Sequence, residues 1–500
     1  MDVLSPTFEA LGYLVAAVCF ILALKGLSSP GSARRGNLIG AAGAALACVV
    51  VLLAEDLDHI GLILLAVGVG SALGVPAARR VAMTQMPQLV ALFNGVGGAA
   101  AALVAALELT ATVAIAGSQL RLPALAVRGD VAFGFSVFGD SGTVGMPATT
   151  ATYLAAVAGA FTVLVGAVSF SGSVITFAKL QELMTTRPVV FPGGPFLMGG
   201  ATAAAIATAV GVVVDARDSI VSPWLLLLLA ALALLVGVLF VLPVGGADVP
   251  IVISLLNAFT GLTVAASGYV LDNVLLLVGG TLVGASGTIL TRMMAAAMGR
   301  STASILFGAF KGGSTAGSTE VSDRPVKVST PEDVAILLAY ARKVVIVPGY
   351  GLAVAQAQHT IHELVEALEA KGVQVVYGIH PVAGRMPGHM NVLLAEASVP
   401  YEALKEMDEA NSELPSTDVA LVVGANDVVN PAAKTSPGSP IYGMPILEVG
   451  QAAAVVFLKR SMRPGFAGIE NDLLHEPGTT MLFGDAKDSL TKVLQALKSL

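Results

Sequence analysis

A short stretch in the last third of the chain has the residue types and spacing to bind an anion. Four β-branched residues, 344–347, indicate a buried strand, and Gly349-Tyr350-Gly351 follows almost at once. A helical pattern then begins, with Ala353 and Val354 in its first turn. A strand, a glycine turn and a helix N-terminus together present free N–H groups and a positive dipole to an anion. Since Val354 replaces the usual third glycine, the motif alone fits an ordinary strand–helix turn equally well.

A second candidate follows the expected strand 453–458, where two cations and a hydroxyl occur as Lys459-Arg460-Ser461. Such a group can hold a phosphate, although a solvated basic loop explains it as well. An NAD site usually has an acid about 20 residues beyond the glycines, at the end of the second strand. Here that strand ends at Ile379-His380, and Glu369 lies before it. The missing acid favours a nucleotide with a 2′-phosphate, which a carboxylate would repel.

Two further loops also follow expected strands. One runs from His380 to His389 and contains Arg385, and the other is Gly424-Ala425-Asn426-Asp427. Doubly wound folds bind ligands outside the carboxyl ends of their strands. Both loops are therefore candidates for the same site.

These motifs lie in a part of the sequence where expected strands and helices alternate. Strand-like runs occur at 344–347, 373–379, 419–424, 446–449, 453–458 and 480–483, and helical ones at 332–341, 352–370, 389–397, 401–410 and 487–499. Such alternation predicts a Rossmann-like α/β domain with a parallel sheet. We place this domain at residues 328–500, after a linker at 301–327 that is rich in Gly, Ser and Thr.

The preceding part of the chain has a different composition. Overall 55% of the 500 residues are hydrophobic and 12% charged, and residues 1–300 contain only 12 of the 27 Lys and Arg. Apolar runs long enough to span a bilayer occur near 8–27, 37–54, 60–78, 87–107, 151–178, 196–214, 223–243, 249–271 and 273–298. The chain thus predicts a polytopic helical membrane domain of about nine spans at 1–300. The net charge of −7 argues against nucleic acid, and two cysteines in apolar runs indicate no metal site.

The charges between the runs predict the orientation of the chain. Nine basic residues fall in one alternate set of loops and three in the other. By the positive-inside rule, the N-terminus lies outside and the C-terminal domain is cytoplasmic. The Gly-rich stretch 110–148 then becomes an external excursion whose function the sequence does not indicate.

Three polar residues in or beside the spans are candidates for a proton path. Asn94 and Asn257 lie within apolar runs, and Asp248 lies in a short loop just before the run of Asn257. Polar groups are costly in lipid and usually face an interior path. The simpler explanations are interhelical hydrogen bonds for the two Asn and a helix N-cap for Asp248, ahead of Pro250.

Several stretches together resemble the β subunit of the proton-translocating nicotinamide nucleotide transhydrogenase, over nearly the whole chain. They are 348–351, 378–385, 387–396, 424–427, 459–462 and 484–487. The resemblance implies that this chain binds NADP(H) and that an α subunit binds NAD(H), with a dimer of αβ units in a bacterial inner membrane. It also implies a proton-translocating, Si-Re-specific NAD(P)⁺ transhydrogenase, an oxidoreductase and translocase that regenerates NADPH.

The resemblance assigns roles to particular residues. It implies that the cofactor is bound by Gly349, Tyr350, Gly351, Ala353, Val354, Arg385, Gly424, Asn426, Asp427, Lys459, Arg460, Ser461, Gly465, Phe466, Gly484 and Asp485. It assigns His380 and Asp427 to a switch facing the membrane, and Asp248, Asn257 and Asn94 to proton coupling. Many relatives have His at the position of Asn94. Because asparagine cannot titrate near neutral pH, we expect a water wire to carry the proton here instead of a histidine.

No acid or base catalyst is expected, because hydride moves directly between two nicotinamides. Two other functions also fit parts of the sequence. One is a secondary transporter or channel with a nucleotide-sensing cytoplasmic domain, and the other is a membrane anchor for a soluble dehydrogenase. The missing acid after the second strand argues against the sensor, and the intramembrane polar residues argue against the anchor.

Overall fold

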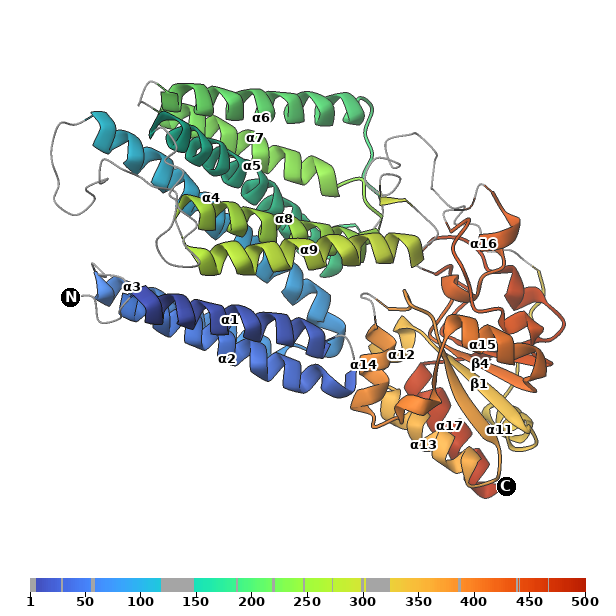
Figure 1. Cartoon of the computed structure of the whole chain (residues 1–500). Helices are drawn as coiled ribbons and strands as arrows, with labels where there is room; N and C mark the ends of the chain where they lie inside the picture. Colours follow the sequence, from blue (N-terminus) through green and yellow to red (C-terminus); the bar gives the residue numbers. More distant parts are fainter. Residues whose placement is uncertain are drawn as a thin grey trace.

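The structure is a computed structural model of the whole chain. It describes residues 6–27, 30–54, 59–117, 148–185, 188–217, 221–245, 248–271, 273–297, 301–302, 324–384, 388–437, 439, 441–465 and 467–500. Most of the expected linker therefore lies outside the described residues, as do Arg385 and Phe466. Figure 1 shows a helical part joined to a domain built around a sheet.

Nine helices among the described residues are long and apolar enough to cross a membrane, which confirms the predicted number. They are α1 (Pro6–Leu27), α2 (Pro30–Ala54), α3 (Ile60–Arg80), α4 (Met86–Gly117), α5 (Ala148–Leu180), α6 (Gly194–Arg217), α7 (Pro223–Val241), α8 (Val249–Val270) and α9 (Val274–Ala297). Helices α4 and α5 extend into both ends of the stretch 110–148, whose residues 118–147 lie outside the described part.

Helices α4 to α9 pack together, and α1 and α2 lie side by side below them in Figure 1. The most buried span is α8, with 61% of its apolar window covered, whereas α3 has no buried residue. Glycines allow the closest approach, because a Cβ on Gly261 of α8 would lie 2.4 Å from the backbone N of Gly284 on α9. The covered face of α8 therefore lies at the centre of the bundle.

The C-terminal domain contains a six-stranded sheet in which every pairing is parallel, with the order β3-β2-β1-β4-β5-β6. The strands are β1 (Lys343–Pro348), β2 (Gln374–Ile379), β3 (Leu404–Glu406), β4 (Val419–Val423), β5 (Ala454–Lys459) and β6 (Thr479–Phe483). This is the strand order of the doubly wound dinucleotide-binding fold. The predicted α/β domain with a parallel sheet is confirmed.

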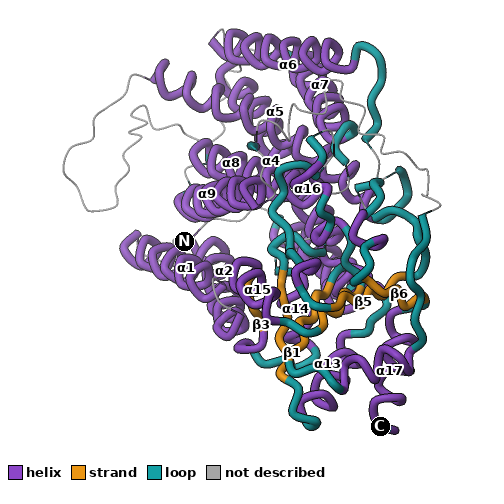
Figure 2. The backbone as a smooth tube through the Cα atoms, turned by 90° about the vertical axis from the view of Figure 1, so that its right-hand side faces the viewer, coloured by secondary structure: helices purple, strands orange, loops and turns teal. Residues whose placement is uncertain are grey.

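Helices cover both faces of the sheet, as Figure 2 shows. The helices of this domain are α11 (Pro331–Ala339), α12 (Tyr350–Val354), α13 (Gln358–Glu369), α14 (His389–Glu396), α15 (Met407–Glu413), α16 (Ala432–Thr435) and α17 (Ala486–Ser499). Val344 and Ile346 of β1 join the core on the side of α11, α13 and α17, whereas Val345 and Val347 join the core on the side of α15. Because neighbouring residues of a strand face opposite sides, the run of four apolar residues supplies both cores.

Three of the expected elements differ in the structure. The run 446–449 is not a strand, because Leu447 donates its N–H to Val428 O in a loop and the segment continues into a 3₁₀ turn. The strand that completes the six-stranded sheet is β3, which lies inside the expected helix 401–410. It pairs with residues 377–379 of β2. The expected helix 352–370 is divided into α12 and α13, with Gln356 at φ 50° between them.

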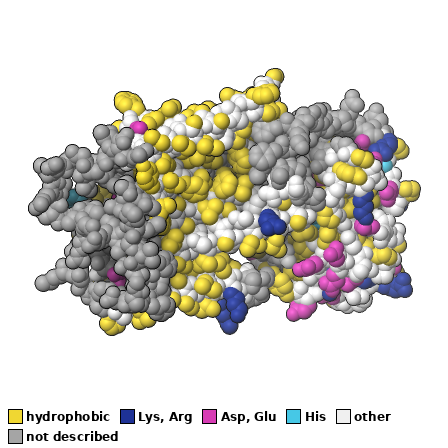
Figure 3. All heavy atoms as spheres, turned by 45° about the horizontal axis from the view of Figure 1, so that its top comes forward, with side chains coloured by type: hydrophobic (Ala, Val, Ile, Leu, Met, Phe, Trp, Pro, Cys, Tyr) yellow, Lys and Arg dark blue, Asp and Glu magenta, His cyan; other side chains and the backbone are white. Residues whose placement is uncertain are grey.

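Figure 3 shows hydrophobic side chains over the helical part and charged ones over the other end. This distribution matches the uneven charge of the sequence and is the one expected of a membrane domain attached to a domain in water.

Candidate functional site

The glycine turn lies at the point where the strand order reverses, between β1 and β4. Gly349 donates its N–H to Val423 O and Gly351 donates its N–H to Gly424 O, and both distances are 2.9 Å. A Cβ on Gly349 would lie 2.3 Å from Gly424 O, and Gly424 itself has φ +72°. Two loops that are about 75 residues apart in sequence therefore meet backbone to backbone, in the crevice where such folds bind nucleotides.

The residues after the turn divide between the core and a cavity. Ala353 is buried in the core, so its side chain does not face the crevice. Val354 is 46% exposed. Together with Tyr350, Gly351 and Arg460, it lines one side of a cavity of about 350 Å³. The cavity therefore brings the glycine turn and the basic loop after β5 to a single space.

A polar network joins the loops after β4 and β5. Lys459 Nζ donates to Asn426 Oδ1 at 3.1 Å, and Asn426 Nδ2 donates to Asp427 Oδ1 at 2.9 Å. Burial lowers the pKa of Lys459, and attraction by Asp427 and Glu470 opposes that shift. A bound phosphate would stabilise the ammonium further, so the donor set fits an anionic group.

Gly465 and Ala467 lie against this network. Ala467 donates its N–H to Asp427 Oδ2 at 2.9 Å, and a Cβ on Gly465 would lie 2.5 Å from Asn426 Nδ2. Phe466, the expected lid residue, lies outside the described residues. The side chains of Arg460 and Ser461 are exposed beside the network. A lid at this place would thus be fastened through Asp427.

Gly484 and Asp485 lie after β6, and their visible contacts are structural. Asp485 caps α17 by accepting the N–H of Lys487 at 3.0 Å. Gly484 has φ +153°, and a Cβ there would lie 2.5 Å from Ser489 Oγ. The need for a sharp turn and a cap explains both residues without a ligand.

His380 lies at the end of β2, with 2% of its surface exposed. Its Nδ1 accepts the N–H of Val382 at 3.2 Å, so Nε2 carries the proton and donates to Pro445 O at 2.8 Å. Burial lowers the pKa of His380, although the bond to Pro445 opposes this shift. The ring is therefore neutral, and its two nitrogens link Val382 to Pro445.

The same loop contacts the membrane helices. Val382 packs against Ile251 of α8 and against Met294 and Ala295 of α9. The cavity beside the glycine turn also has one wall from the membrane part, which includes Gln88 and Gln181. The structure thus brings the loops after β1 and β2 to the ends of the membrane helices.

Asn94 belongs to a polar cluster shared by three membrane helices. It is 8% exposed, and its Nδ2 donates to Ser173 Oγ at 3.0 Å and to Ser169 Oγ at 3.5 Å. Ser169 in turn lies 2.6 Å from Thr260 Oγ1 on α8. The two serines are one helical turn apart on α5, and this spacing is a signal that the sequence interpretation did not use. Asn94 Oδ1 has no partner among the described residues, which leaves an acceptor for water.

Asp248 immediately precedes α8, and Asn257 lies in the N-terminal half of that helix. Asp248 is the N-cap residue ahead of Pro250, but its side chain makes no capping hydrogen bond. Asn257 is half-buried and lies one turn from Thr260 of the polar cluster. Asn257 therefore lies on the helix that also contacts the loop after β2, and Asp248 lies at its start.

Lys179, one of the nine basic residues counted between the apolar runs, is 0% exposed at the end of α5. Its Nζ donates to three backbone carbonyls at the end of α7, on Leu242 at 2.6 Å, Val244 at 2.7 Å and Val241 at 3.0 Å. A cation at a helix C-terminus stabilises the negative end of the dipole and the unpaired carbonyls there. No local pattern distinguishes this lysine from a solvated one.

The described residues include no group of three His, Cys, Asp or Glu that could hold a metal ion. The family model described as "NAD(P) transhydrogenase beta subunit" matches residues 9–496. A relative from Rhodospirillum rubrum named NAD(P) transhydrogenase subunit beta is 45% identical over 487 residues, which cover 97% of this chain and 98% of the relative. A protein of the same name from a specified strain of that species matches with the same figures.

Proposed function

Because this chain belongs to the family of NAD(P) transhydrogenase beta subunits, we propose that it binds NADP(H) and couples hydride transfer to proton movement. A beta subunit of this enzyme implies an alpha-subunit partner, and we assign NAD(H) to that partner. The observation that carries the proposal is the crevice between β1 and β4, where the glycine turn faces the Asn426–Lys459 network.

The site supports NADP(H) more than NAD(H). Lys459, Arg460 and Ser461 supply donors for a 2′-phosphate, and β2 ends in His380 rather than an acid. The N–H groups at the start of α12 lie beside the close contact of Gly349 with Gly424. That contact explains why both positions are glycine, and we assign the diphosphate to this glycine turn because doubly wound folds bind it there.

When bound, the nicotinamides supply the hydride chemistry, and no side chain of this chain needs to act as acid or base. This chain's residues bind and orient the nucleotide, and Asp427 fastens the segment 465–468 that would exclude water from it. The shared cavity wall and the contact of Val382 with α8 and α9 support direct communication with the membrane part.

In the membrane part we assign proton movement to the polar cluster of Asn94, Ser169 and Ser173, with Asp248 and Asn257 as coupling residues. Asn94 does not titrate, but its unpartnered Oδ1 suits an ordered water. We further propose a dimer of αβ units in a bacterial inner membrane. The N-terminus would lie outside and the domain at 328–500 in the cytoplasm.

The test is a calorimetric titration of the full-length chain in nanodiscs with NADP⁺ and, separately, NAD⁺. We expect strong preference for NADP⁺, and at least roughly 100-fold weaker binding of NADP⁺ in the double variant Lys459→Ala/Arg460→Ala, because each charged hydrogen bond contributes about 1.5–3 kcal/mol. Lys498→Ala, an exposed change in the last turn of α17, is the control. Equal binding of both nucleotides would contradict the proposal and favour a nucleotide-sensing transporter.

A further inference from the structure

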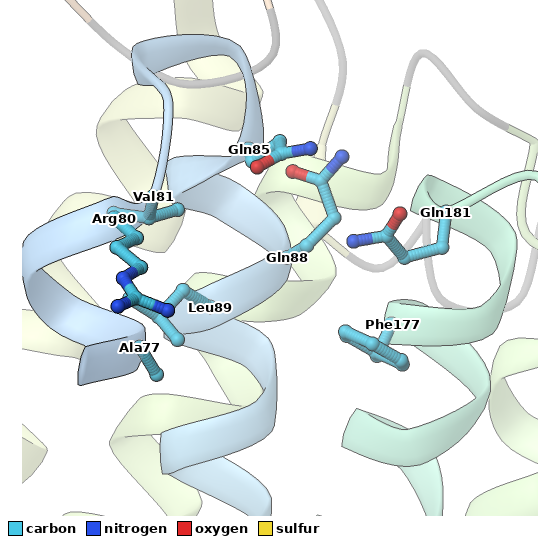
Figure 4. Close-up of a pocket in the computed structure, with 8 residues that line it drawn as sticks. All are labelled: Ala77, Arg80, Val81, Gln85, Gln88, Leu89, Phe177 and Gln181. Carbon is cyan, nitrogen blue, oxygen red and sulfur yellow. The ribbon is translucent and has the colours of Figure 1, made fainter. Parts of the chain in front are cut away.

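A second cavity, of about 240 Å³, lies between the ends of α3, α4 and α5. Figure 4 shows its lining residues. The amides of Gln85, Gln88 and Gln181 gather at one end, and Phe177 and Leu89 lie toward the other. The cavity is therefore polar at one end and apolar at the other.

A cation also belongs to this cavity. Arg80 is the last residue of α3, and its guanidinium lies beside Leu89 and Ala77 in Figure 4. Its neighbour Arg79 is not among the lining residues. Arginine binds phosphate oxygens through two parallel N–H groups, so Arg80 gives the cavity a site for a phosphate.

Gln88 provides the second, independent observation. It is 4% exposed, and its Nε2 donates to Leu180 O at 3.2 Å. Its Oε1 is buried and accepts no hydrogen bond from the described residues. An unsatisfied buried acceptor costs about 1–3 kcal/mol, which a ligand that donates an O–H or N–H would recover.

The location of the cavity selects the kind of ligand. Its residues come from the ends of three of the membrane-spanning helices, at the level where the lipid headgroups meet water. Helix α3 has no buried residue, so this chain leaves the surface of that helix open to lipid. A ligand that has a hydrogen-bond donor at one end, an apolar part at the other and a phosphate between them, next to the apolar part, matches this surface.

We propose that this cavity binds the headgroup of a phospholipid whose phosphate is followed by a hydrogen-bond donor, such as phosphatidylethanolamine or phosphatidylglycerol. Arg80 holds the phosphate, Gln88 Oε1 accepts from the headgroup donor, and the start of an acyl chain lies along Ala77, Leu89 and Phe177. Basic pockets between membrane helices are known to bind lipid headgroups in this way. The inference does not depend on the nucleotide chemistry proposed above.

The cavity also borders the proposed nucleotide site, because Gln85, Gln88 and Gln181 line both cavities. A bound headgroup would fix these three amides and with them one wall of the space beside Tyr350 and Arg460. The lipid site is thus placed to influence how the C-terminal domain rests on the membrane helices.

The proposal can be tested by native mass spectrometry of the full-length protein. The protein is loaded separately with phosphatidylethanolamine, phosphatidylglycerol and phosphatidylcholine. We expect the first two to be retained at least fivefold better than phosphatidylcholine, whose quaternary headgroup has no donor. Arg80→Gln should weaken retention of both by roughly tenfold, whereas the matched control Arg79→Gln should leave it unchanged. Equal losses in the two variants would overturn the assignment of Arg80.

Two further measurements separate the alternatives. Gln88→Leu should abolish the preference over phosphatidylcholine while leaving residual binding through Arg80, and an unchanged preference would overturn the role of its Oε1. Inorganic phosphate at millimolar concentration should not displace the lipid. Displacement would mean that the cavity is a site for free phosphate, and the lipid proposal would then be wrong.

Discussion

The buried ammonium of Lys179 links two helices of the membrane part, α5 and α7. A buried ammonium is costly unless it is paired and hydrogen-bonded. Here the ammonium has three carbonyl partners, all of them at the C-terminal end of α7 or just beyond it. The lysine thus links α5 to the segment 241–245, which leads into Asp248. Any role of Asp248 in coupling depends on where this segment is held.

Replacing Lys179 by Met keeps most of the length of the side chain and removes the ammonium that donates the three hydrogen bonds. We expect Lys179→Met to lower the free energy of unfolding by roughly 2–4 kcal/mol, because charged hydrogen bonds are lost and carbonyls are left unpaired. Thermal unfolding of the purified protein in nanodiscs measures this change. Thr176→Val is the control, since its buried hydroxyl bonds only Gly172 O of its own helix. Similar small shifts in both variants would show that the link carries little stability.

At the scale of elements, glycine positions decide how closely the helices of the bundle approach. Helices α8 and α9 are in contact through Gly261, Gly268 and Gly280, where any Cβ would lie within 2.4 Å of a backbone nitrogen. In contrast, Gly279 has nothing within 4 Å of the position of its Cβ. Two consecutive glycines therefore differ: Gly280 allows the close packing of α8 and α9, whereas Gly279 makes no packing contact.

The pair Gly279 and Gly280 gives a matched test of this packing. Gly280→Ala should destabilise the protein by roughly 1–3 kcal/mol, because its Cβ would lie 2.3 Å from the backbone N of Ala265 and the helices must separate. Gly279→Ala adds the same methyl group to an open face, and should be neutral or stabilising by up to about 1 kcal/mol. Thermal unfolding of both variants is the measurement. Equal stability of the two would refute the close approach of α8 and α9.

At the scale of the whole molecule, α8 connects the proposed proton path with the C-terminal domain. It begins directly after Asp248 and carries Asn257 and Thr260, and Ile251 on the same helix packs against Val382. A change of charge near the start of α8 can thus reach the loop after β2 through one rigid element. Such coupling requires that the two states of the membrane part differ in how they hold that loop.

Asp248→Asn removes the titratable group at the start of α8 and keeps its size. We expect proton-coupled turnover of the reconstituted complex with its alpha subunit to fall strongly in proteoliposomes. Measured by calorimetry, this chain should still bind NADP⁺, because Asp248 is not among the residues that line the cavity beside the glycine turn. Normal proton-coupled turnover in this variant would remove Asp248 from the mechanism.

The sequence by itself determined the two-part architecture, because apolar length and strand–helix alternation are local properties. It located the glycine turn and the loops Gly424–Asp427 and Lys459–Ser461, since turn residues follow apolar runs. It was wrong at 446–449, because the apolar residues Ile446, Leu447 and Val449 are buried in the domain without pairing to a strand.

Only the tertiary structure decided which of these pieces meet. The contact of Gly349 with Gly424 follows from the order of the strands, and no local pattern encodes that order. The hydroxyl partners of Asn94, the carbonyls around Lys179 and the unpartnered oxygen of Gln88 depend on helix packing. Packing is set by the fit of whole helix surfaces, so the chemistry of a buried polar residue becomes known only when its neighbours on other helices are known.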